Sequence, residues 1–132
     1  MSQENVETVR QILEGWGAGD FGPGVAAFDP QVTLVVPPAF LESGVYVGAE
    51  GIREFTRRFV AAYERVTIEA TALRVAGDTV LADVLQVGNG RSSGLEMRIP
   101  YYMLFTLRGG KIVRMESMLD EGDALEAAGL RE

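Results

Sequence analysis

Three stretches of the chain carry the residue pattern of an α-helix. Hydrophobic residues recur at three- and four-residue steps behind a Ser2 cap and predict a first helix that ends among glycines; they are Val6, Val9, Ile12, Leu13 and Trp16. The stripe Ile52, Phe55, Phe59 and Tyr63 predicts a helix over residues 49–63. A last helix is expected over 120–128, where Asp120 suits the cap and Gly129 the end.

Elsewhere the hydrophobic period changes to two, which predicts β-strands. A β-branched run at 32–36 is stopped by two prolines, a short helix is expected from Pro23 to about Phe28, and residues 37–48 are expected to be loop. Four further strands are predicted at 66–76, 79–88, 95–107 and 111–119. Short connections make these an antiparallel meander, so the fold class is α+β, with helices covering one face of a curved sheet.

Alternation along the last two strands predicts which side chains share a face. A three-residue connection at 108–110 places Leu107 opposite Lys111. The resulting apolar face, expected to lie under the helices, pairs Phe105 with Val113, Met103 with Met115, Tyr101 with Ser117 and Ile99 with Leu119. The reverse face is mixed and holds Tyr102, Leu104, Arg114, Glu116 and Met118.

Asp83 is the most distinctive polar residue in this pattern. It interrupts an apolar row between Leu81 and Leu85, and a carboxyl group that faces a hydrophobic cavity can serve as a general acid or base. Tyr101 and Ser117 could then orient a ligand oxygen. Two alternatives stay open: Asp83 lies in a shifted register or pairs with a nearby Arg, and the Tyr101 hydroxyl binds a backbone carbonyl.

Composition narrows the chemistry. The 132 residues, of 14.3 kDa, fit a single domain over 1–132, and the absence of Cys and His excludes thiolate and imidazole catalysis. A net charge of -7 disfavours nucleic acids and anionic membranes. No secretory signal or membrane-spanning run is evident, so a cytoplasmic protein without a cofactor is expected.

Several strings resemble the nuclear transport factor 2-like superfamily, and within it the SnoaL-like and ketosteroid-isomerase-like proteins. They are GAGD at 17–20, YVGAEGIREF at 46–55, GKIV at 110–113 and ALEAAGL at 124–130. The resemblance implies a cone-shaped α+β barrel with a curved antiparallel sheet, helices on its concave face and a pocket between them. It also implies a homodimer joined through the outer sheet face, at Tyr102, Leu104, Arg114, Glu116 and Met118.

The same resemblance bears on the reaction. Val36, Ile12 and Met103 stand where isomerases carry catalytic groups, so that set is absent. Asp83 matches the general-acid position of limonene-type epoxide hydrolases, but their other two positions hold Leu81 and Ser117.

Three hypotheses result: an acid–base enzyme acting on an apolar oxygen-bearing molecule, a non-catalytic binder of such a molecule, and a dimeric interaction module with a filled core. Asp83 and Tyr101 are the predicted catalytic groups. The predicted ligand contacts are Trp16, Val36, Tyr46, Phe55, Phe59, Met103, Met115 and Ser117.

Overall fold

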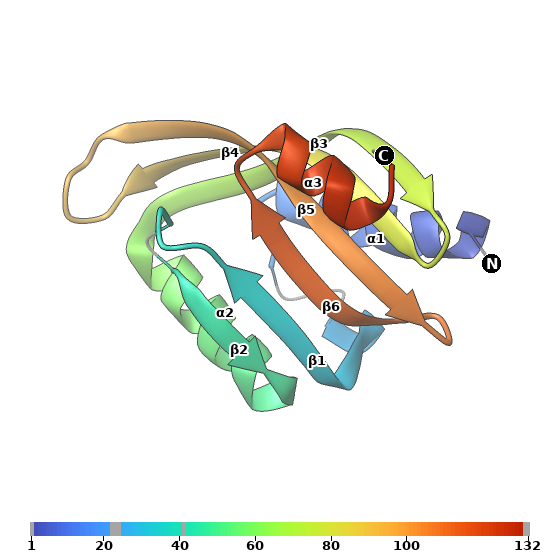
Figure 1. Ribbon diagram of the computed structural model, residues 1–132. Helices are drawn as coiled ribbons and strands as arrows, with labels where there is room; N and C mark the ends of the chain where they lie inside the picture. Colours follow the sequence, from blue (N-terminus) through green and yellow to red (C-terminus); the bar gives the residue numbers. More distant parts are fainter. Residues whose placement is uncertain (1, 22–24, 41, 131–132) are drawn as a thin grey trace.

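The computed structural model describes residues 2–21, 25–40 and 42–130, which form one sheet and three α-helices (Figure 1). The helices are α1 (Ser2–Gly17), α2 (Gly48–Ala62) and α3 (Glu121–Ala128). The strands are β1 (Phe28–Val36), β2 (Gly44–Val47), β3 (Tyr63–Ala76), β4 (Thr79–Gly90), β5 (Glu96–Arg108) and β6 (Lys111–Met118). None of the described helices is long and apolar enough to cross a membrane.

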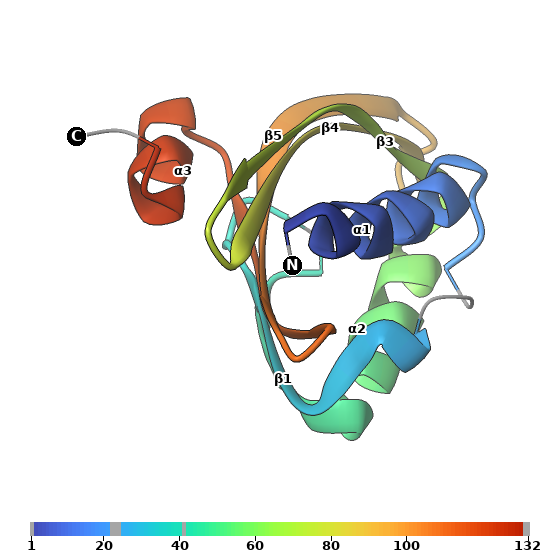
Figure 2. The same cartoon turned by 90° about the vertical axis from the view of Figure 1, so that its right-hand side faces the viewer.

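The sheet is six strands wide and strongly curved. Its order is β2-β1-β6-β5-β4-β3, and the neighbours are antiparallel except for β1 and β6, which run parallel. Figure 2 shows β3, β4 and β5 arching over α1, with α2 on the same concave side. The predicted α+β fold is confirmed, with one parallel pair in the predicted antiparallel sheet. The main core fills the space between α1, α2 and the concave face.

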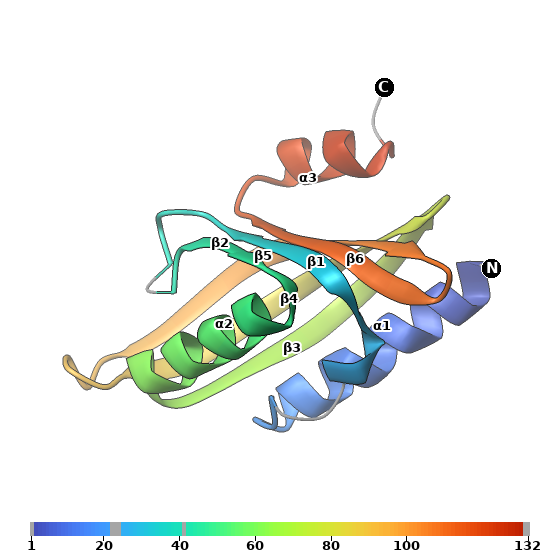
Figure 3. The same cartoon turned by 90° about the horizontal axis from the view of Figure 1, so that it is seen from below.

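α3 differs from the expectation that the helices lie on the concave face, because it packs on the outer face of the sheet (Figure 3). Its Ala124 and Ala128 cover Leu81 and Leu104, which are buried. The predicted cap and stop are confirmed: the Asp120 carboxylate accepts the Asp123 N–H, and Gly129 adopts a left-handed φ of 76°.

This packing explains much of the apolar character of the outer face. Tyr102 and Met118 pack against the α3 cluster, while Arg114 and Glu116 form an ion pair at 3.3 Å. A face that was expected to be covered by a second copy of the chain is therefore partly covered by the chain's own last helix. The homodimer stays a prediction.

Between α1 and α2 the structure differs from the predicted elements in two places. In place of a helix from Pro23 to Phe28 there is one 3-10 turn at Val25–Ala27, and β1 already begins at Phe28; Pro23 itself lies outside the described residues. Strand β2 lies within the predicted loop and pairs with β1. With only four residues, Gly44–Val47, β2 is too short to show a clear alternation. The side chain of Ser2, the predicted cap, also lies outside the described part.

The β5–β6 register differs from the predicted one. The connection has two residues, Gly109 and Gly110, with φ of 59° and 79°, and Arg108 pairs with Lys111. A bulge after this turn then shifts the ladder, so that Phe105 faces Met115 and Met103 faces Ser117. The predicted pairing of Tyr101 with Ser117 is therefore wrong, although both side chains are on the buried inner face.

The bulge also changes which residue of β6 enters the core near the turn. Ile112 is fully buried, whereas Val113, predicted to face Phe105, is only half-buried. Leu119, expected on the apolar face, lies beyond the end of β6 and is exposed.

Candidate functional site

Asp83 lies on the outer face of the sheet, which α3 partly covers, and away from α1 and α2. Its β4 neighbours Ala82 and Val84 point inward, opposite Met103 and Tyr101 of β5. The Asp83 carboxylate accepts a hydrogen bond of 2.7 Å from Arg74 of β3, and Glu121 of α3 lies 3.7 Å from the same guanidinium. The expectation that Asp83 faces the cavity is wrong, and the alternative of an Arg partner is confirmed.

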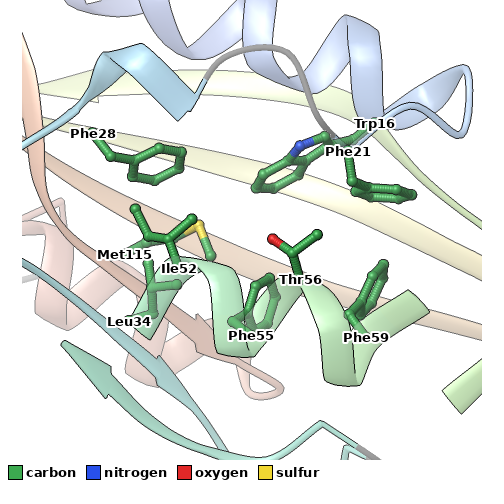
Figure 4. A pocket seen from close by; sticks show the side chains of 9 residues that line it. All are labelled: Trp16, Phe21, Phe28, Leu34, Ile52, Phe55, Thr56, Phe59 and Met115. Carbon is green, nitrogen blue, oxygen red and sulfur yellow. The ribbon is translucent and has the colours of Figure 1, made fainter. Parts of the chain in front are cut away.

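An apolar cavity lies between the end of α1, α2, β1 and β6 (Figure 4). It encloses about 20 Å³, roughly the room that one water molecule needs. The side chains that line it are Trp16, Phe21, Phe28, Leu34, Ile52, Phe55, Thr56, Phe59 and Met115. None of these is titratable, so the part of the cavity surface that the described residues form carries no charge.

Four of the five aromatic side chains that line this cavity form a continuous cluster. The Phe21 ring lies 5.9 Å from Trp16 and meets Phe59 edge-on at 4.9 Å, and Phe55 stacks against Phe59 at 5.6 Å. These centroid distances fall in the range of favourable ring pairs. Much of the cavity wall is thus formed by aromatic rings.

Thr56 is the one hydroxyl residue in the wall. Within the described part of the chain its hydroxyl makes no hydrogen bond. In the same part of the chain, every buried side-chain nitrogen or oxygen that is closed off from open space has a hydrogen-bond partner. The Thr56 oxygen therefore borders open space, and Figure 4 shows it turned toward the centre of the ring of apolar side chains. It can donate one hydrogen bond and accept others from a bound molecule.

A second polar feature, the polar row, consists of Tyr101, Gln86, Tyr63 and Glu42. Tyr101 donates to Gln86 Oε1 at 2.6 Å, Gln86 Nε2 donates to the Tyr63 hydroxyl at 3.0 Å, and Tyr63 donates to Glu42 Oε1 at 3.3 Å. All four residues are buried, and Glu42 is only 2% exposed. The polar row is therefore a continuous series of hydrogen bonds in which each group donates to the next, and the last bond ends on the Glu42 carboxyl oxygen.

Burial sets the protonation of the polar row. It raises the pKa of Glu42, partly offset by hydrogen bonds, including that from Tyr63, and by the positive charge of Arg58. It also raises the pKa of Tyr63 and Tyr101 well above the ordinary value, so both phenols remain protonated donors at neutral pH.

The segment between β1 and β2, described except at residue 41, covers the polar row. Tyr46 donates to the Glu42 carbonyl at 2.7 Å, and Arg58 of α2 donates to the Tyr46 hydroxyl at 2.8 Å and to the Ser43 carbonyl at 3.3 Å. The Phe40 ring meets Tyr101 edge-on at 4.7 Å. These contacts hold Glu42 inside.

The predicted ligand contacts divide into two groups. Trp16, Phe55, Phe59 and Met115 line the apolar cavity. The rest are buried without lining it: Tyr46 is bonded to the covering segment, and the others are Val36, Met103 and Ser117. Tyr101, a predicted catalytic group, lies in the polar row and does not line the cavity.

The sequence analysis missed two residues of the polar row, Gln86 and Glu42. Gln86 interrupts the inward apolar row of β4 as Asp83 interrupts the outward one, so the same signal was present on the opposite face. Glu42 lies in an irregular segment and gave no periodic signal. Of the cavity wall, Phe21, Phe28, Leu34, Ile52 and Thr56 were not predicted as ligand contacts.

Comparisons with solved structures agree on the fold. TerC, co-crystallised with polyporic acid, is 21% identical over 95% of this chain and 97% of its own, with a TM-score of 0.77. A putative SnoaL-like polyketide cyclase from Jannaschia sp. CCS1 is 20% identical over 99% and 95%, with a TM-score of 0.75. SalBIII, an epoxide hydrolase/cyclase-like enzyme in pyran ring formation in the polyether salinomycin, is 24% identical over 92% and 94%, with a TM-score of 0.73.

Sequence comparison gives the family. No curated protein matches the chain, but a family model does, and its match covers residues 9–115, most of the sequence. The curved sheet over two helices and the apolar cavity between them are consistent with that match. The chain belongs to the SnoaL-like domain family.

Proposed function

We propose that this protein binds a small, flat, apolar molecule in the cavity between α1, α2 and the concave sheet. The observation that carries the proposal is a wall of aromatic rings with one hydroxyl, that of Thr56, which has no hydrogen-bond partner among the described residues. An uncharged wall disfavours an ionised group at this position, because burying a charge without a partner is costly. The ligand portion bound here is thus a neutral ring, and an acceptor oxygen on it suits Thr56.

The small volume of the cavity requires the wall to move when a ring enters. Phe55 and Phe59 lie on one face of α2, and Met115 has a flexible unbranched side chain that repacks readily. The same small volume favours a second candidate function, an interaction module with a filled core. The two candidates differ in whether the cavity takes up a ligand.

Ligand binding in the cavity can be measured by Trp16 fluorescence, because Trp16 is the only tryptophan in the chain and lines the cavity. Acetophenone and α-methylstyrene, which match in shape but differ in one acceptor oxygen, would be titrated while Trp16 emission is followed. We expect saturable changes with both probes and tighter binding of acetophenone. An emission that stays unchanged up to the solubility limit would favour the filled core.

Two variants provide a matched control. Phe59 and Phe105 are both buried, at 1% and 0% exposure, but only Phe59 lines the cavity. We expect Phe59→Leu to change probe affinity about fivefold or more and Phe105→Leu to leave it unchanged, with circular dichroism confirming that both fold. Equal effects of the two variants would place the bound probe elsewhere.

A further inference from the structure

The polar row is connected to the apolar cavity through one side chain. Phe59 lines the cavity, and its ring packs against that of Tyr63 at 5.3 Å. Tyr63 is also the last donor of the polar row. A molecule that fills the cavity and displaces the Phe59 ring would therefore reach the end of the row.

The hydrogen-bonding pattern determines which kind of group can bind at the Tyr63 end of the polar row. The Tyr101 hydroxyl donates to Gln86, so the Gln86 amide presents its N–H to Tyr63, and the Tyr63 hydrogen must point onward. Reversing the chain would leave the buried Tyr101 hydroxyl without its acceptor, which is costly. The row therefore presents one O–H donor and takes an acceptor oxygen, a position now filled by Glu42 Oε1.

The positive charge of Arg58 favours an anionic acceptor at this end of the row, whereas burial opposes one. Arg58 lies within electrostatic reach of Glu42 and lowers the pKa of that carboxyl, against the larger effect of burial. If Glu42 left the interior, the Arg58 charge and the Tyr63 hydroxyl would remain without that carboxylate. A ligand carboxylate would restore both the hydrogen bond and the charge balance.

We propose that the polar row is the second half of the ligand site, that it takes the carboxylate of an aromatic acid, and that Glu42 occupies it when the site is empty. The inference rests on the proposed function, because the ring of the same molecule would lie in the apolar cavity. Glu42 then acts as an internal competitor of the ligand.

Displacement of Glu42 from the interior has one unfavourable and one favourable effect on the free energy. It breaks the contacts that hold the covering segment, namely those of Tyr46 and Arg58 with the Glu42 and Ser43 carbonyls. In return, a carboxyl group whose charged form is disfavoured by burial regains hydration. Removing the Glu42 side chain therefore leaves the polar row open without the need to expel a competitor.

The test compares phenylacetate with isobutylbenzene, which has the same shape but no charge or acceptor. We expect Glu42→Ala to bind phenylacetate at least tenfold more tightly than the unaltered protein, with isobutylbenzene changing by less than about twofold. Adding Tyr63→Phe to Glu42→Ala should abolish the gain. Trp16 emission reports both probes, and circular dichroism checks the fold.

A measurement on the unaltered protein keeps the test independent of variant folding. Saturating phenylacetate should release Glu42 into water and lower its pKa toward the ordinary value, as followed by carbon NMR of labelled glutamate. Isobutylbenzene could bind while phenylacetate neither binds more tightly to Glu42→Ala nor lowers the pKa of Glu42. That result overturns the inference and leaves the proposed function standing. If neither probe binds, both fail together.

Discussion

Replacing Gln86 with Leu tests whether the polar row acts as one hydrogen-bonded unit. Gln86 connects two buried phenols, Tyr101 at 2.6 Å and Tyr63 at 3.0 Å. The leucine would leave the Tyr101 hydroxyl without an acceptor, at about 1–3 kcal/mol for a buried unsatisfied donor. Loss of the bond to Tyr63 adds about 0.5–1.5 kcal/mol. We therefore expect the free energy of unfolding to fall by about 2–4 kcal/mol.

Urea denaturation followed by circular dichroism measures this, with Tyr101→Phe as the second arm of a double-mutant cycle. Tyr101→Phe alone orphans the Gln86 oxygen, whereas the double variant removes both partners, so its loss should be smaller than the sum by about 1–2 kcal/mol. Gln31→Leu, at an exposed position of β1, is the control and should stay within about 0.5 kcal/mol. Additive losses in the cycle would refute the coupling.

Three further predictions address single groups. Asp83→Asn should weaken the partly exposed pair with Arg74, lower the free energy of unfolding by about 0.5–1 kcal/mol, and leave probe binding unchanged; altered binding would contradict its outer position. Thr56→Val should remove the preference for acetophenone over α-methylstyrene, a change of about three- to tenfold in relative affinity by titration. Because burial raises the pKa of Glu42, its stabilising effect is complete below the ordinary value of 4.5 and is lost as the pH rises through the raised pKa. Urea denaturation across this range should therefore show the unaltered protein losing stability relative to Glu42→Gln, and parallel curves would contradict the burial of Glu42.

The sequence predicted most helices and strands because their hydrophobic period is long and regular. Tyr63, placed in the predicted helix, instead begins β3, and the bulge at the start of β6 was not visible in the alternation. Bulges and two-residue turns depend on backbone geometry that several sequences tolerate, so a register read from alternation alone can shift.

The prediction that the Asp83 face of β4 points inward was wrong for a different reason. Both rows of β4 are largely apolar, because α3 covers the outer row at Leu81 while α1 and α2 cover the inner one. Alternation correctly separated Asp83 from Gln86 but contained no information on which helix covers which face. The resemblance to epoxide hydrolases pointed to Asp83, and the structure directs attention to Gln86 instead.

The proposed function requires that the aromatic cavity takes up a ring. The most direct measurement is the anomalous scattering of bromine in crystals soaked with bromobenzene. We expect a peak enclosed by Phe55, Phe59 and Met115, with the Trp16 and Phe59 rings displaced to make room. Crystals in which this space holds no bromine, with peaks on the surface alone, would contradict the proposed function.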